Sequence, residues 1–113
     1  MIEKTLMKYL SGRLKPVPVV MEYPEDRTVP CVIIEKTGSS KYNYIQRATV
    51  AFQSVHSTLQ KAAELNETVK EAVESMETLP AIGSVSLNSD YNFTDTGMKQ
   101  YRYQAVYDIT YTE

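Results

Sequence analysis

YRYQAVYDITY, residues 101–111, is the stretch that decides the fold of this chain. Side chains alternate along a strand, so one face would carry Tyr101, Tyr103, Ala105, Tyr107, Ile109 and Tyr111. Each phenol is an apolar ring with a hydroxyl that needs a partner or water, and four of them are more than a small core is expected to bury. Because aromatic residues are enriched in interface cores, this face is predicted to contact another protein.

A hairpin is predicted to lead into this strand. Residues 84–93 read as its partner strand, with Val85 and Leu87 facing inward and Tyr91 as a further inward candidate. Residues 94–97, TDTG, read as the connection. The last two strands are therefore expected to pair in antiparallel fashion.

A helix is predicted before this hairpin. Ser57 and Gln60 match a capping box, and the helix is expected to run to about Glu77, where Pro80 follows. The residues that recur at helical spacing define its buried face, and they are Leu59, Ala62, Ala63, Asn66, Val69, Val73 and Met76. The two alanines and two valines keep this face slim, so the helix should lie close against a sheet.

A long hairpin is predicted in the first half of the chain. Residues 31–37 form a β-branched strand, residues 38–40 (GSS) read as a turn or flexible tip, and residues 42–55 are extended. Thirteen residues, 43–55, would span roughly 43 Å, whereas a domain of this length has a radius of gyration of about 13 Å. Part of this stretch, with residues 37–41, should therefore project as an arm or bend around the core.

The N-terminal segment completes the architecture. Residues 2–14 are predicted to be a helix with an apolar stripe, and residues 17–22 a short strand at a sheet edge, because Pro18 lacks an N–H group. One domain spanning residues 1–113 is expected. Its fold class is predicted as α+β, a mostly antiparallel twisted sheet with two helices packed on one face and a projecting β-hairpin.

Composition and motifs offer little support for catalysis. The net charge is −2, and the single cysteine, Cys31, indicates a reducing compartment. The single histidine, His56, lies beside Ser54 and Ser57, but sequence neighbours rarely supply the geometry of a catalytic pair. Asp90 and Asp95 flank a hairpin and could meet a divalent cation, although turn chemistry explains Asp95 more simply. The chain is expected to be non-enzymatic, without a cofactor, bound metal or membrane span.

Two charged surfaces admit more than one interpretation. The second helix carries five glutamates against two lysines, which indicates either a solvated face or an acidic surface toward a basic partner or a channel through which DNA slides. Lys41, Tyr42, Tyr44 and Arg47 interleave cations with aromatic rings, as nucleic-acid surfaces do. Because the chain is net acidic, a protein-contact arm is the preferred interpretation.

Taken together, these segments resemble the tail-completion, or tail-terminator, proteins of long-tailed bacteriophages and prophages. The resemblance covers nearly the whole chain and rests on VPVVMEYPED (17–26), VPCVIIEKTGSS (29–40), ATVAFQSVHST (48–58) and RYQAVY (102–107). It implies a structural virion protein, assembled in the bacterial cytoplasm, that forms a ring, usually a hexamer. The ring would cap the tail-tube protein and meet the head connector or neck proteins, with DNA only as passing cargo.

The expected interface residues are Tyr42, Tyr44 and Arg47 on the arm and Tyr101, Arg102 and Tyr103 on the last strand, because aromatic residues and arginine carry much interface energy. Two alternatives stay open. One is a head–tail connector or neck-completion protein, which is a similar small α+β domain. The other is a monomeric α+β module that binds a small ligand in a pocket between sheet and helix.

Overall fold

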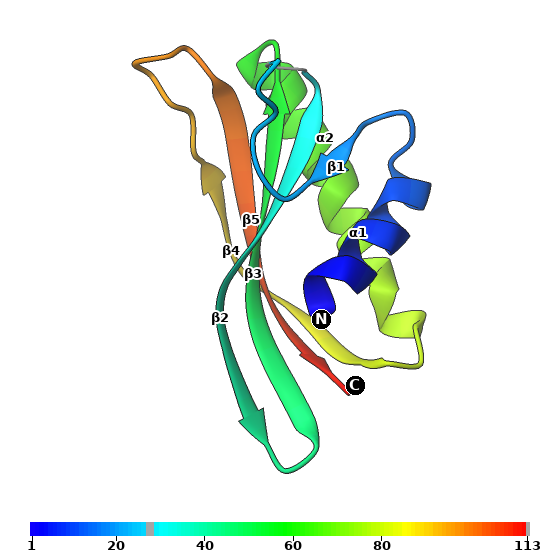
Figure 1. Cartoon of the computed structure of the whole chain (residues 1–113). Helices are drawn as coiled ribbons and strands as arrows, with labels where there is room; N and C mark the ends of the chain where they lie inside the picture. Colours follow the sequence, from blue (N-terminus) through cyan, green and yellow to red (C-terminus); the bar gives the residue numbers. More distant parts are fainter. Residues whose placement is uncertain (27–28, 113) are drawn as a thin grey trace.

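The computed structural model describes residues 1–26 and 29–112, and within them the α+β prediction is confirmed: a twisted sheet carries α1 and α2 on one face (Figure 1). The elements follow in chain order as α1 (Ile2–Arg13), β1 (Val19–Val20), β2 (Cys31–Tyr42), β3 (Ile45–His56), α2 (Leu59–Glu74), the 3₁₀ turn η1 (Ser75–Thr78), β4 (Ile82–Asn92) and β5 (Tyr101–Tyr111).

The strand order in the described chain is β1-β2-β3-β5-β4, with β3 at the centre. β1 runs parallel to β2, and the β2–β3, β3–β5 and β4–β5 pairs are antiparallel. The prediction of an edge strand near Pro18 is confirmed, although that strand has only the two residues Val19 and Val20. The tyrosine strand β5 therefore lies inside the sheet.

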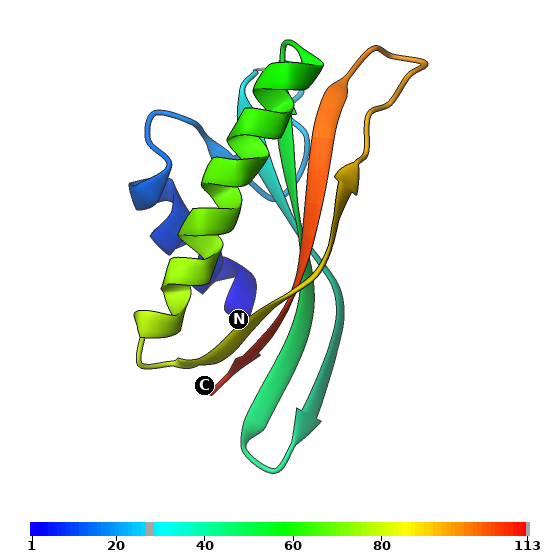
Figure 2. The same cartoon turned by 180° about the vertical axis from the view of Figure 1, so that it is seen from behind.

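The main core fills the space between the sheet and the helices. The predicted apolar stripe of α1 is confirmed, since Ile2, Leu6, Leu10 and Leu14 are all buried. α2 lies along the sheet (Figure 2) and buries a slim face, which lets it approach the strands closely. Phe52 of β3 and Tyr107 of β5 meet edge to face beneath it, with ring centroids 5.9 Å apart, a favourable arrangement for aromatic pairs.

The ends of α2 differ from the prediction. Thr58, not Ser57, is the N-cap: its backbone is extended, and its hydroxyl accepts a hydrogen bond from the Lys61 N–H at 3.1 Å. The Ser57 N–H instead donates to Nδ1 of His56 at 2.8 Å. The α-helix ends at Glu74 rather than about Glu77, because the last turn tightens into η1.

The turn of the long hairpin lies further along the chain than the sequence predicts. Residues 38–40 lie inside β2, and the reversal occurs at Asn43 and Tyr44, between the paired residues Tyr42 and Ile45. Asn43 has φ 57°, a left-handed conformation that asparagine tolerates and a two-residue hairpin requires. The glycine in GSS suggested a turn, but Gly38 does not adopt a positive φ.

The outer part of this hairpin, residues 37–47, is here called the arm. It begins at a bulge, because the pairing register shifts between Lys36 and Gly38 and leaves Thr37 as the extra residue. From Glu35 to Ile45 every residue is exposed. The molecule measures 44 Å along its long axis against 25 and 24 Å across, and the arm projects at one end of it, opposite the β4–β5 turn (Figure 1).

β4 buries fewer of its side chains against the core than the sequence predicts. Val85 is buried, but Leu87 and Tyr91 are 47% and 41% exposed. A second register shift lies between Leu87 and Ser89. Tyr91 is on the other face of the sheet, where its hydroxyl accepts a hydrogen bond from Nε2 of Gln104 at 2.5 Å.

Candidate protein-contact surfaces

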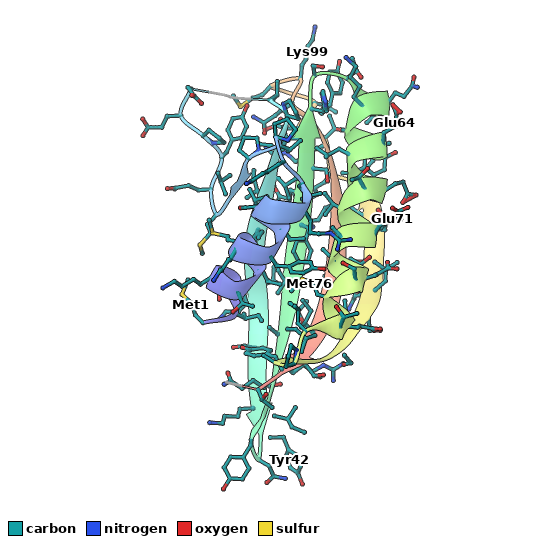
Figure 3. All side chains as sticks on the ribbon, turned by 90° about the vertical axis from the view of Figure 1, so that its right-hand side faces the viewer. Met1, Tyr42, Glu64, Glu71, Met76 and Lys99 are labelled. Atoms are coloured by element: carbon teal, nitrogen blue, oxygen red, sulfur yellow. The ribbon has the colours of Figure 1, made fainter. Side chains whose placement is uncertain are left out.

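The arm holds the most exposed aromatic side chains of the described chain. Tyr42 and Tyr44 are 79% and 88% exposed, and Ile45 beside them is 53% exposed. Tyr42 stands at the extremity of the molecule (Figure 3). Backbone pairing of β2 with β3 continues to Tyr42 and Ile45, so the arm is a regular hairpin to its tip. A preformed hairpin loses little conformational freedom when it binds, which favours its use as a contact element.

The six predicted interface residues do not form one surface. Arg47 pairs with Thr110, while Arg102 pairs with Val55. These pairs are eight residues apart on β3, or about 26 Å. The arm residues therefore lie near one end of the molecule, and Tyr101, Arg102 and Tyr103 lie near the other. They define two separate candidate surfaces.

The prediction that the tyrosine face of β5 is too polar to bury is wrong for half of its tyrosines. Tyr107 is 0% exposed and Tyr111 is also buried, because this face lies against the core beneath the helices. The Tyr107 hydroxyl donates to Oε2 of Glu74 at 2.5 Å, and the Tyr111 hydroxyl donates to Oε1 of Gln46 at 3.3 Å. Each ring lies in the core while its hydroxyl reaches a polar partner.

Burial and the neighbouring Glu74 carboxylate both raise the pKa of Tyr107 well above its ordinary value. The phenol therefore stays protonated and keeps donating to Glu74. Tyr101 and Tyr103, toward the other end of the strand, are half-buried. Only this end of the tyrosine face can contribute contact area to a partner among the described residues of β5.

Arg102 is engaged within its own chain on the face of the sheet away from the helices. Its Nη1 donates to Oε1 of Gln53 at 2.6 Å, and Nε2 of Gln53 donates to Oε1 of Gln104 at 2.9 Å. Its guanidinium lies 5.8 Å from the centroid of the Tyr23 ring. Gln53 and Gln104 are buried, so Arg102 completes a polar network that would otherwise lack a donor.

Replacing Arg102 by methionine should therefore lower the free energy of unfolding by about 1–3 kcal/mol, because the buried Gln53 oxygen loses a charged donor. Urea denaturation measures the difference. The matched control is Arg47→Met on the exposed arm, which should stay within about 0.5 kcal/mol of the wild type. Equal losses of stability in the two variants would show that the Arg102 network does not stabilise the fold.

Cys31 and His56 have ordinary structural surroundings. Burial raises the pKa of the Cys31 thiol, although nearby Arg102 acts in the opposite direction. Partial burial and the Lys61 cation lower the pKa of His56. Within residues 1–26 and 29–112, no group of three or more histidine, cysteine or carboxylate side chains is arranged to hold a metal ion.

Asp90 has partners from α2. Its Oδ1 accepts from Nδ2 of Asn66 at 2.7 Å, and its Oδ2 accepts from Nζ of Lys70 at 2.6 Å. Glu67 lies 2.7 Å from the same lysine. The hydrogen bond to Asp90, and to a smaller extent the one to Glu67, raises the pKa of Lys70. The predicted burial of Asn66 is confirmed, and Asp90 is the partner that makes it possible.

An open groove of about 580 Å³ runs beside α1. It is lined by Thr5, Lys8, Tyr9, Gly12, Arg13 and Leu79. The Tyr9 hydroxyl is 2.7 Å from that of Ser75, and the Arg13 guanidinium lies 5.6 Å from the Tyr9 ring centroid. The sequence offered no signal for this groove, because α1 and the segment after η1 meet only in the fold.

The described residues contain no helix that is both long and apolar enough to cross a membrane. Neither a protein-family model nor a curated protein sequence matches this chain.

Proposed function

We propose that this protein is a non-enzymatic subunit of a bacteriophage or prophage particle that caps the tail tube and joins it to the head connector by forming a ring. The observation that carries the proposal is the arm, a hairpin with exposed Tyr42 and Tyr44 beyond a self-contained core. Aromatic side chains are expensive to leave in water and contribute strongly when a partner covers them. The resemblance of the sequence to tail-completion proteins supplies the kind of partner.

The separation of core and arm suits a part that folds first and assembles afterwards. The helices and sheet bury their own apolar stripe, so the arm is not needed to complete the main core. An arm at one end of the subunit meets a different surface on its neighbour. Such heterologous contacts close into rings when the rotation between subunits allows it.

Unpaired strand edges offer a further means of contact. In the described chain, β1 pairs with β2 only at Val32 and Ile33, so the outer edge of β2 from Ile34 to Tyr42 has no strand neighbour. The outer edge of β4 lies at the other side of the sheet. Edges of this kind accept a strand from another chain.

The charge of the chain fits DNA as cargo rather than as a ligand. The net charge of the chain is −2, so its surface is negative on balance. A surface of this sign repels a polyanion and would keep passing DNA from adhering. The subunit is proposed to act in the virion after assembly in the host cytoplasm.

Two other functions compete with this one. A neck-completion protein would use the same arm toward a different partner in the particle. A monomeric ligand-binding module is favoured by the groove beside α1. The ligand-binding hypothesis predicts a single subunit in solution and saturable binding of a small apolar ligand. The ring hypothesis predicts neither result.

Tube capping is tested with the tail-tube protein whose gene is expected beside the gene of this chain. Purified subunit is added to polymerising tube protein, and tube lengths are measured by electron microscopy. Mean tube length should fall as the ratio of subunit to tube protein rises, with a ring visible at one end. Unchanged tube lengths, or a neighbourhood without a tail-tube gene, would contradict the proposal.

A further inference from the structure

We propose that neighbouring copies of this chain meet through the cationic surface of α1 on one copy and the acidic surface of α2 on the next. This inference rests on the proposed ring and names the surfaces that orient its subunits. The partner is a second copy of this chain, and the argument is charge complementarity between two surfaces of the same molecule.

The surface of α1 is strongly cationic. Residues 1–20 contain the cations Lys4, Lys8, Arg13 and Lys15 and a single acidic side chain, Glu3. All four cations are exposed, whereas Glu3 is half-buried and lies 3.6 Å from Lys36. Within the described part of the chain, neither Lys4 nor Lys8 has a salt-bridge partner. These charges are therefore available to another molecule.

The surface of α2 has the opposite sign. Glu64, Glu67, Glu71 and Glu74 recur three or four residues apart, which places them along one exposed stripe. Lys70 is already engaged by Glu67 and Asp90 and does not neutralise the rest of the stripe. Like charges at this spacing destabilise an isolated helix, so an external cationic surface would relieve the repulsion.

The shared cationic face of α1 is shorter than the acidic stripe of α2. Lys4 and Lys8 are four residues apart on one face of α1, or about 6 Å along the helix, whereas Arg13 lies half a turn around the helix from Lys4. Glu64 and Glu74 are ten residues apart, or about 15 Å. Gly12 has open space where a side chain would stand, and the groove beside α1 follows the same surface. A neighbouring helix can therefore approach α1 closely at Gly12.

The positions of the stripes favour a contact between copies. α1 contacts β1 and β2, near one edge of the sheet, whereas α2 contacts β3, β5 and β4 on the other side. Glu64 and Glu71 point away from α1 (Figure 3). The acidic loop residues Glu22, Glu25 and Asp26 belong to the segment that also contains Tyr23, which packs on the opposite sheet face against Cys31, Ile33 and Val55.

Complementary charges of this kind set orientation and association rate more than total affinity. A contact made by one face of one helix on each copy also buries less than the roughly 800 Å² per partner that stable complexes bury. The α1–α2 contact would therefore act together with the arm, the stripes fixing how subunits are oriented and the aromatic tip adding buried area.

Charge reversal on each surface separately, and then in mixture, tests the contact. Lys4→Glu with Lys8→Glu makes the α1 surface acidic like that of α2, and Glu64→Lys with Glu71→Lys makes the α2 surface cationic like that of α1. Each variant alone should self-associate about tenfold more weakly than the wild type in sedimentation velocity at about 0.05 M NaCl, and wild-type association should weaken at about 0.5 M NaCl. Mixed in equal amounts, they should restore assembly, with the variants alternating in complexes of even copy number seen by native mass spectrometry.

Lys99→Glu controls for net charge, because Lys99 is exposed at the end of the molecule opposite Tyr42 (Figure 3). It should leave assembly unchanged, and circular dichroism should show all variants folded. Three results would overturn the contact. They are reversal variants that each assemble as strongly as the wild type, an equal mixture of the two that does not assemble, and a wild type that is monomeric at low salt. Tube capping is measured separately, so a failed charge exchange with intact capping would remove this contact and leave the proposed function standing.

Discussion

Tyr107→Ala should lower the free energy of unfolding by about 3–5 kcal/mol, the range for removing a large aromatic side chain from a core. The ring is fully buried, packs edge to face on Phe52 and lies beneath α2. Little in the surrounding sheet can collapse into the space, because Ala105 and Ile109 are already buried on the same face. Urea denaturation with circular dichroism detection measures the change.

Two control substitutions separate burial from the hydroxyl contact. Tyr107→Phe keeps the ring and loses only the hydrogen bond to Glu74, which is itself exposed, so a loss of about 1 kcal/mol or less is expected. Tyr101→Ala, a half-buried tyrosine on the same face of β5, should cost clearly less than Tyr107→Ala. If the two alanine variants were equally stable, Tyr107 would not belong to the core.

Tyr44→Ala combined with Arg47→Ala should weaken self-association by about a hundredfold, since aromatic residues and arginine dominate interface energies. Both side chains are exposed on the arm, so the fold itself should keep its stability. Multi-angle light scattering across a dilution series, or native mass spectrometry, reports the shift toward the monomer. An unchanged oligomer would remove the arm from the proposed function.

The matched control for the arm lies at the opposite end of the molecule. Met98 is 54% exposed, and Lys99 next to it is also exposed. Met98→Ala with Lys99→Asn removes an apolar side chain and a cation, as the arm variant does. Asparagine is chosen because Lys99 has φ 51°, a conformation that asparagine accepts better than alanine. This variant should assemble as the wild type does.

The sequence predicted the architecture because local patterns and burial agree in most elements. The stripe of α1, the buried face of α2 and the period of two in β5 each reflect one packed side of an element. The projecting hairpin followed from length alone, since a strand as long as β3 cannot be covered by so small a core. These features depend on residues that are close together in the sequence, so the local pattern of apolar and polar residues is enough to predict them.

The errors concern features that depend on residues far apart in the chain. The GSS segment has turn composition, yet pairing with β3 keeps it extended and moves the reversal to Asn43. The face of β5 has too many hydroxyls for an isolated core, but Glu74 of α2 and Gln46 of β3 accept hydrogen bonds from two of them. Arg102 is predicted at an interface because arginine contributes strongly to interface energies. Its hydrogen-bond partner Gln53 is 49 residues away, so no local pattern indicates the contact within its own chain.

The route by which the arm joins the domain has a mechanical consequence. β3 runs from the tip into the centre of the sheet and is flanked there by β2 and β5. Cross-strand hydrogen bonds lie perpendicular to the strands, so a pull along the arm would load many of them at once in shear rather than opening them one after another. A tension applied at Tyr42 and Tyr44 would thus be distributed through the middle of the domain, a property suited to a joint between two large bodies.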